Sequence, residues 1–140
     1  MSELSAFFAQ NPGVDMTEAF VVSDRFKDKQ GHPVPWKIRT MTEAQNEEIR
    51  RSATRLVKGK NGAKVPETNS EDYLAKLVVA SVVFPDLKNA ELQQSYGVIG
   101  SEQLLKTMLL SGEYATLAQK VQTVNGFDRD INELVEDVKN

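Results

Sequence analysis

EDYLAKLVVASVVFP, residues 71–85, is the most apolar stretch of the chain and the one that decides its fold. Small or apolar side chains recur there at the 3, 4, 7 and 8 spacing of one helical face: Tyr73, Leu74, Leu77, Val78, Ser81 and Val82. Asn69 or Ser70 suits the cap position, and Pro85 cannot continue the helix. The pattern predicts a central helix of about 14 residues and roughly 21 Å, buried nearly all round.

The composition is that of an ordinary globular protein. The 140 residues, 40% hydrophobic and 26% charged, are typical of a single domain covering residues 1–140. There is no cysteine, which excludes disulfides, thiolate metal sites and cysteine nucleophiles. No apolar run reaches the roughly 18 residues of a membrane span, and the start MSELSAFFAQ lacks the features of a signal peptide. We therefore expect a protein that stays in the cytoplasm, without contact with a membrane.

Charge is distributed unevenly along the chain. Residues 1–66 hold eleven Lys/Arg against eight Asp/Glu, a net +3, whereas residues 67–140 hold six against twelve, a net −6. Six basic residues and no acidic one lie between Arg50 and Lys64, and an acidic run follows at residues 128–137. These regions are either two solvated surfaces or contacts for a protein or a nucleic acid.

The N-terminal third contains the strand signals. Alternating apolar residues predict strands from Thr17 to Phe26 and from Val34 to Thr40, joined by a turn-rich segment, which makes a β-hairpin over residues 17–40. Before it, residues 2–10 carry Phe7 and Phe8 in a short amphipathic segment that ends at a Pro-Gly joint. Such a segment is too short to be stable alone, so it docks either on its own domain or on a partner.

The rest of the chain has helical patterns. A capping box at Thr42 and Gln45 predicts a helix to about Val57, and the glycine-rich residues 58–68 predict a flexible loop. Further helices are expected after Pro85, the last of them an acidic amphipathic helix over residues 130–139. The expected fold is therefore α+β: a predominantly helical bundle over residues 42–139 with an N-terminal β-hairpin.

No pattern for catalysis, a metal or a cofactor is present. His32 is the single histidine and lies in a turn, away from other residues at ligand spacing. GKNGAK lacks the spacing of a phosphate-binding loop, and no GxSxG elbow occurs. Residues 101–125 have the outline of a helix-turn-helix, but the second helix offers few side chains for DNA. We predict a non-enzymatic protein that binds other proteins, with a small nucleic-acid-binding or regulatory helical module as the alternative.

Several stretches resemble one known family. The run DYLAKLVVASVVFPDLKNAELQQSYGVIGSEQLLKTMLLSGEYATLAQKVQTVNGFD, residues 72–128, is similar to the XkdN-like tail assembly chaperones of tailed phages and of phage-like elements of Gram-positive bacteria. The opening MSELSAFF, the segment RFKDKQGHPVPWKIR and the segment TEAQNEEIRRS are also similar. The likeness covers nearly the whole chain and is a sequence pattern without a catalytic signature.

The resemblance implies a cytoplasmic assembly factor. Such chaperones are thought to coat the tape measure protein, keep it soluble and recruit tail tube protein, without remaining in the mature particle. The resemblance also allows a homo-oligomer. It supplies no cofactor and no catalytic residue.

The protein-binding residues must therefore come from the sequence pattern. A helper for an apolar client needs modest apolar surfaces that are repeated over many copies. The hypothesis is that two exposed apolar groups contact a client or a neighbouring copy: Phe7, Phe8, Ile131, Leu134, Val135 and Val138. The alternative is that these side chains close the core of their own monomer.

Overall fold

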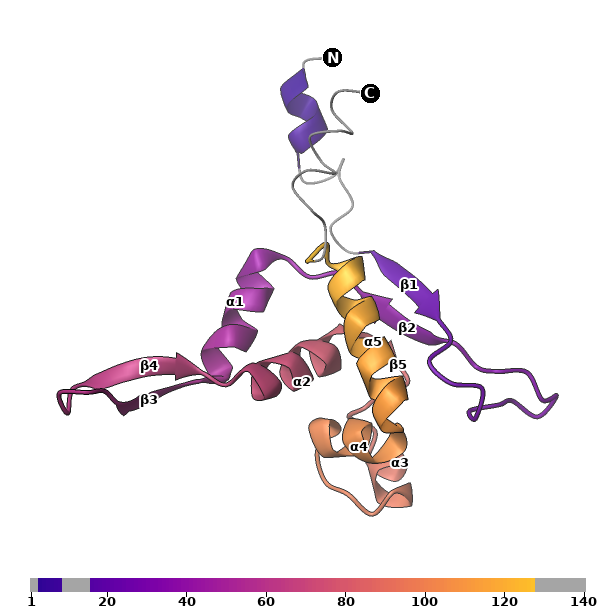
Figure 1. Ribbon diagram of the computed structural model, residues 1–140. Helices are drawn as coiled ribbons and strands as arrows, with labels where there is room; N and C mark the ends of the chain where they lie inside the picture. The colour runs from indigo at the N-terminus through magenta and orange to yellow at the C-terminus, as the bar shows by residue number, and fades with distance from the viewer. Residues whose placement is uncertain (1–2, 9–15, 128–140) are drawn as a thin grey trace.

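The computed structural model describes residues 3–8 and 16–127 (Figure 1). The elements follow in the order η1 (Glu3–Phe7), β1 (Thr17–Phe20), β2 (Trp36–Arg39), α1 (Glu43–Ser52), β3 (Thr54–Lys58), β4 (Lys64–Thr68), α2 (Ser70–Ser81), β5 (Val82–Phe84), α3 (Ala90–Ser95), α4 (Ser101–Met108) and α5 (Ser111–Val124). None of the helices in these residues is both long and apolar enough to cross a membrane.

The fold is a mixed α+β arrangement, so the expectation of a predominantly helical bundle with an N-terminal β-hairpin was wrong. Two antiparallel sheets are present in the described residues, one with the order β1-β2-β5 and the other formed by β3 and β4. In the first sheet β1 and β2 pair from Thr17 opposite Arg39 to Phe20 opposite Trp36. Its third strand, β5, comes from the end of the stretch predicted as the central helix.

The change from helix to strand at Val82 has a local cause. Pro85 disfavours helical backbone at the residue before it, and Val82, Val83 and Phe84 are β-branched or aromatic side chains that suit a strand. The helix α2 therefore ends at Ser81, and β5 pairs with β2, with Val82 opposite Ile38. Because the pairing partner lies more than forty positions away in the sequence, the periodicity of the stretch does not reveal it.

The second sheet occupies the region predicted as the end of a helix and a flexible loop at 58–68. The helix α1 has the expected capping box at Thr42 and Gln45, but it ends at Ser52 with Ala53 as its C-cap. A tight turn follows β3, in which the N–H of Gly59 donates to the carbonyl of Ala63 at 2.7 Å. This turn folds the glycine-rich segment back as β4.

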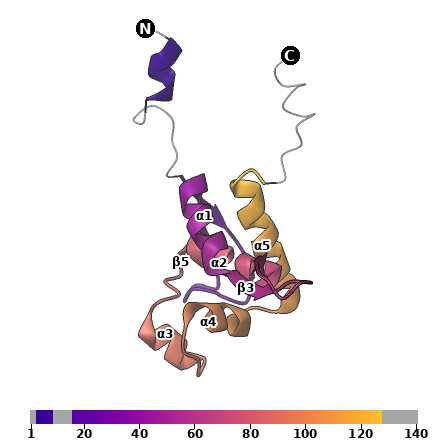
Figure 2. The same ribbon diagram turned by 90° about the vertical axis from the view of Figure 1, so that its left-hand side faces the viewer.

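The core lies where α2 meets the first sheet and the later helices. The helix α2 contacts α1, α4, α5 and β5, and both views show it in the middle of the molecule (Figures 1 and 2). Its side chains Ala75, Leu77, Val78 and Ser81 are buried. The other fully or nearly buried apolar residues come from every layer around it: Val22, Trp36, Ile38, Leu87, Leu104, Leu105, Met108, Leu109, Leu117, Ala118 and Val121. The central helix predicted for residues 71–84 is present as α2 up to Ser81, whereas residues 82–84 form β5 instead.

Ser81 is a polar residue within this core, and replacing it should stabilise the protein. Its side chain is completely buried, and its Oγ atom has no hydrogen-bond partner among the described residues. A buried unpaired hydroxyl loses its bonds to water, so Ser81→Ala should raise the free energy of unfolding by about 1 kcal/mol, measured by chemical denaturation. Ser95→Ala is the control, because Ser95 is exposed and its Oγ donates to the carbonyl of Leu92. A loss of stability in Ser81→Ala would contradict the prediction.

Candidate protein-binding site

An apolar hollow of about 220 Å³ opens beside the first sheet. Its walls come from the loop between β1 and β2, from β2 and β5, and from the helices α3 and α4: Phe26, Val34, Trp36, Phe84, Pro85, Leu92, Tyr96 and Met108. We call this set the apolar hollow. An apolar cavity of roughly 150 Å³ holds a benzene molecule, so this hollow has room for one large apolar side chain.

The floor of the apolar hollow is set by Trp36. Its indole is 2% exposed, and the ring of Phe26 lies 6.1 Å from it at an interplanar angle of 48°. Phe26 is held there because its carbonyl accepts a 2.8 Å hydrogen bond from the N–H of Val34, next to the bridge between Lys27 and Pro33. The loop between β1 and β2 is therefore pinned to the start of β2, and this pairing forms one wall.

An ion pair fixes the same loop to α5. The guanidinium of Arg25 donates from Nε to Glu113 at 3.1 Å, and it also donates to the carbonyl of Met108 at 2.9 Å. Arg25 lies over the ring of Phe26, 4.9 Å from its centre. Hydrogen bonds from Arg25, Ser23 and the N–H of Leu110 hold the pKa of Glu113 down at about 2. The ion pair between Arg25 and Glu113 thus connects the wall of the apolar hollow to the beginning of α5.

The lowered pKa of Glu113 predicts a stability that depends on pH. A carboxylate whose pKa is lower in the folded state stabilises the fold above its unfolded pKa, and this stabilisation is lost as pH falls from about 5 to about 2. Glu113→Gln should therefore lower the denaturation midpoint at neutral pH, and the difference from wild type should vanish near pH 2. Glu91→Gln, at an exposed position of α3, is the control. A difference that stays constant across this range would exclude the ion pair as its cause.

The outer rim of the apolar hollow is exposed. Val83 and Phe84 are each 46% exposed, and β5 is an edge of the sheet in the described residues. An exposed apolar side chain beside a hollow and an unpaired strand edge is the arrangement that accepts a partner chain. Sequence reasoning missed Phe84 because it placed this residue in a buried helix, although the following Pro85 was the signal for a strand.

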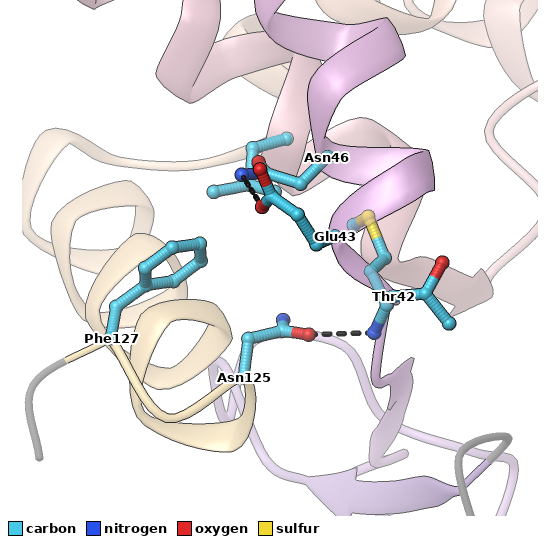
Figure 3. A pocket seen from close by; sticks show the side chains of 7 residues that line it. Thr42, Glu43, Asn46, Asn125 and Phe127 are labelled. Atoms are coloured by element: carbon cyan, nitrogen blue, oxygen red, sulfur yellow. Dashed lines mark hydrogen bonds between the residues drawn. The ribbon is translucent and has the colours of Figure 1, made fainter.

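A second hollow, of about 180 Å³, lies between α1 and the end of α5 (Figure 3). Asn125 accepts a 2.7 Å hydrogen bond from the N–H of Met41, and Asn46 donates to the carboxylate of Glu43 at 3.2 Å. The bonds from Asn46 and Arg50 lower the pKa of Glu43. Glu43 is the one ionisable group among the described residues of this lining, so the lining contains no acid and base pair. The hydrogen bond between Asn125 and Met41 therefore connects the end of α5 to the start of α1 at this hollow.

The residues predicted to bind proteins fall into two groups. Phe7 and Phe8 are 79% and 48% exposed, and η1 contains no buried residue. In both views η1 lies apart from the sheets and helices (Figures 1 and 2), so it does not meet the apolar hollow. The second group lies outside the described residues: Ile131, Leu134, Val135 and Val138. Within residues 3–8 and 16–127, no three His, Cys, Asp or Glu side chains are grouped to hold a metal ion.

Comparisons with known proteins place this fold in a family. The model of the phage XkdN-like tail assembly chaperone family matches residues 4–139. The chain is 28% identical to the phage-like element PBSX protein XkdN of Bacillus subtilis (strain 168) over 137 residues, which are 96% of this chain and 93% of that protein. It is 31% identical to the protein YqbN of the same organism, also over 137 residues, which are 96% and 92% of the two chains.

A solved structure agrees with the sequence relatives. The crystal structure of YqbN superposes on 91% of this chain and 99% of that chain, with a TM-score of 0.76 and 26% sequence identity. Both the family model and these relatives extend across nearly the whole sequence. This chain therefore belongs to the family of phage XkdN-like tail assembly chaperone proteins.

Proposed function

We propose that this chaperone binds the tape measure protein and helps to recruit tail tube subunits, without catalysing a reaction. It would act in the cytoplasm of the host cell and be absent from the mature particle. The observation that carries the proposal is the apolar hollow, with the half-exposed Phe84 on its rim. A long helical client exposes apolar side chains before it is enclosed, and one such side chain fits a hollow of about 220 Å³.

The exposed Phe7 and Phe8 of η1 extend this proposal. Their side chains present apolar surface to solvent, because Phe7 is 79% exposed and Phe8 is 48% exposed. A client helix with its side chain in the apolar hollow leaves other apolar side chains free, and η1 offers them a second contact. Each contact is small, so the affinity for the client arises from several contacts and many copies together.

The nucleic-acid alternative has less support in the geometry. The second helix of the helix-turn-helix outline is α5, whose one lysine is Lys120. The Nζ of Lys120 lies 2.8 Å from the carboxylate of Glu18 and 5.5 Å from the ring centre of Phe20. Because a binding helix needs free cations for phosphates, α5 is a poor candidate for a DNA-reading element.

Phe84→Glu should separate chaperone function from folding. The substitution removes an aromatic side chain and places a carboxylate where the client would bury it. Binding of the tape measure protein should therefore weaken roughly tenfold or more. Co-expression with that client and measurement of its soluble fraction tests the proposal, and titration calorimetry gives the affinity. Wild type should keep the client soluble, whereas Phe84→Glu should leave most of it in the pellet.

The control for this experiment is Ile99→Glu. Ile99 is 92% exposed and is not part of the apolar hollow, so the same charge there should leave client binding unchanged. Circular dichroism of both variants checks that they are folded. A folded Phe84→Glu protein that protects the client as well as wild type does would overturn the apolar hollow as the client site. A client that is equally soluble with no chaperone present would overturn the proposed function itself.

A further inference from the structure

The β3–β4 hairpin, residues 54–68, stands out from the rest of the molecule. It begins after α1 and extends away from the other elements (Figure 1). At its base the N–H of Asn69 donates to the carbonyl of Ala53 at 3.0 Å, and all five residues of β4 are exposed. We call this hairpin the basic arm. A two-stranded hairpin is marginally stable at best by itself, which favours a partner that covers it.

The basic arm has an apolar strip on each face. Residues opposite one another share a face, so Leu56 and Pro66 lie together on one side, and Val57 and Val65 lie together on the other. Leu56 is 66% exposed and Val65 is 43% exposed. On the Leu56 face the strip is bordered by Lys58 and Lys64, which are directly opposite each other. That face therefore combines an apolar centre with positive charge at the tip.

Positive charge predominates on the basic arm. Four basic residues, Arg55, Lys58, Lys60 and Lys64, accompany one acidic residue, Glu67, which gives a net charge of +3. None of the four takes part in an ion pair with the described residues. In contrast, Arg50 and Arg51 of the neighbouring α1 pair with glutamates of their own helix. The positive charge of the basic arm is thus available to an acidic partner.

The chain itself contains a segment with the matching chemistry. Residues 128–140 carry five acidic and two basic side chains, a net charge of −3. The helical spacing predicted for Ile131, Leu134, Val135 and Val138 gives an apolar stripe of about 10 Å, and one face of the basic arm between Thr54 and Lys58 is about 14 Å long. The two surfaces thus carry opposite net charge, have similar lengths and each contain apolar side chains.

We propose that the basic arm of one copy binds residues 128–140 of a second copy. The end of α5 is bound beside the start of α1, through Asn125 and Met41, whereas the basic arm begins after the last residue of α1, about 15 Å further on. The described part of the chain therefore ends beside the end of α1 that is remote from the arm, and the concentration dependence of the contact distinguishes an acceptor on a neighbouring copy from one on the same chain. The contact joins two different surfaces, so successive copies associate head to tail. This contact is independent of the client site.

Reciprocal charge reversal in the full-length chain tests this contact. Lys58→Glu with Lys64→Glu removes the positive border of the arm, and Glu133→Lys with Glu136→Lys reverses the acidic segment. Wild type should associate with rising concentration at low ionic strength in sedimentation velocity, and each double variant should associate about tenfold more weakly. The chain that carries all four substitutions should recover association, because the two surfaces are complementary again.

Lys88→Glu with Lys106→Glu is the control, since both side chains are exposed and lie outside the arm. It should associate as wild type does. Hydrogen exchange of the arm amides provides the second measurement, and protection should rise with protein concentration in wild type. A wild type that stays monomeric, or four substitutions that fail to restore association, would overturn the proposal. If protection of the arm amides did not vary with concentration, the acidic segment would contact the arm of its own chain, and this result would also overturn the proposal.

Discussion

Leu77→Ala should lower the free energy of unfolding by about 2–5 kcal/mol, because it leaves a cavity in the centre of the core. Leu77 is 1% exposed and lies on α2, the helix that contacts α1, α4 and α5. Small domains are stable by only about 5–15 kcal/mol, so this one change removes a large part of the total. Urea denaturation followed by circular dichroism measures this loss of unfolding free energy. The m-value should stay unchanged, because a change would mean that the two proteins expose different amounts of surface on unfolding.

Val79→Ala on the same helix is the matched control. Val79 is partly exposed and packs at the edge of the core, and alanine favours the helix more than valine does. Its expected loss is below about 1.5 kcal/mol. If both variants lost the same stability, α2 would not have one deeply buried face, and the central place of this helix would be wrong.

The success of the prediction for α2 and its failure at β5 have one physical origin. Periodicity and capping act within a few residues, and they were sufficient to indicate a helix with Leu77 and Val78 inside. Strand formation depends on a partner, and β5 pairs with β2 across more than forty positions of sequence. The signal that was available locally was Pro85, which was interpreted as the end of a helix and not as the end of a strand.

The basic arm shows the same limit over a shorter range. Thr54 to Val57 continues the apolar spacing of α1, so the helix was extended through it, and the glycines after it indicated a loop. The hydroxyls of Thr54 and Thr68 are 2.7 Å apart, and Arg55 lies opposite Glu67. These cross-strand pairs become visible only when the segment is read as two strands around a turn. The basic charge, in contrast, was clear from the sequence because it needs no pairing.

The place of the candidate site was not predictable from the sequence. Composition and the lack of a catalytic motif favoured a protein that binds proteins through apolar surface, and this stays a prediction. The sequence pointed to Phe7 and Phe8, which are exposed as a contact residue must be. It did not point to Phe84, because the apolar hollow is assembled from five separate segments whose side chains meet only in the folded chain.

Trp36→Ala should be among the most destabilising single substitutions, with a loss of about 3–5 kcal/mol. The indole is 2% exposed, forms the floor of the apolar hollow and contacts the ring of Phe26. Its removal opens the hollow into the core, so both the sheet and the loop between β1 and β2 lose their packing. Thermal and urea denaturation measure the loss, and client binding should fall with it because the folded population decreases.

Phe84→Ala is the counterpart, since it removes an aromatic ring from the rim of the same hollow. Because Phe84 is 46% exposed, the lost burial is smaller, and its destabilisation should be clearly less than that of Trp36→Ala. Client binding should nevertheless weaken, because the ring that borders the hollow is gone while the fold remains. A Phe84→Ala protein as unstable as Trp36→Ala would make Phe84 a residue of the core, and the hollow would then be an internal packing defect with no role in binding.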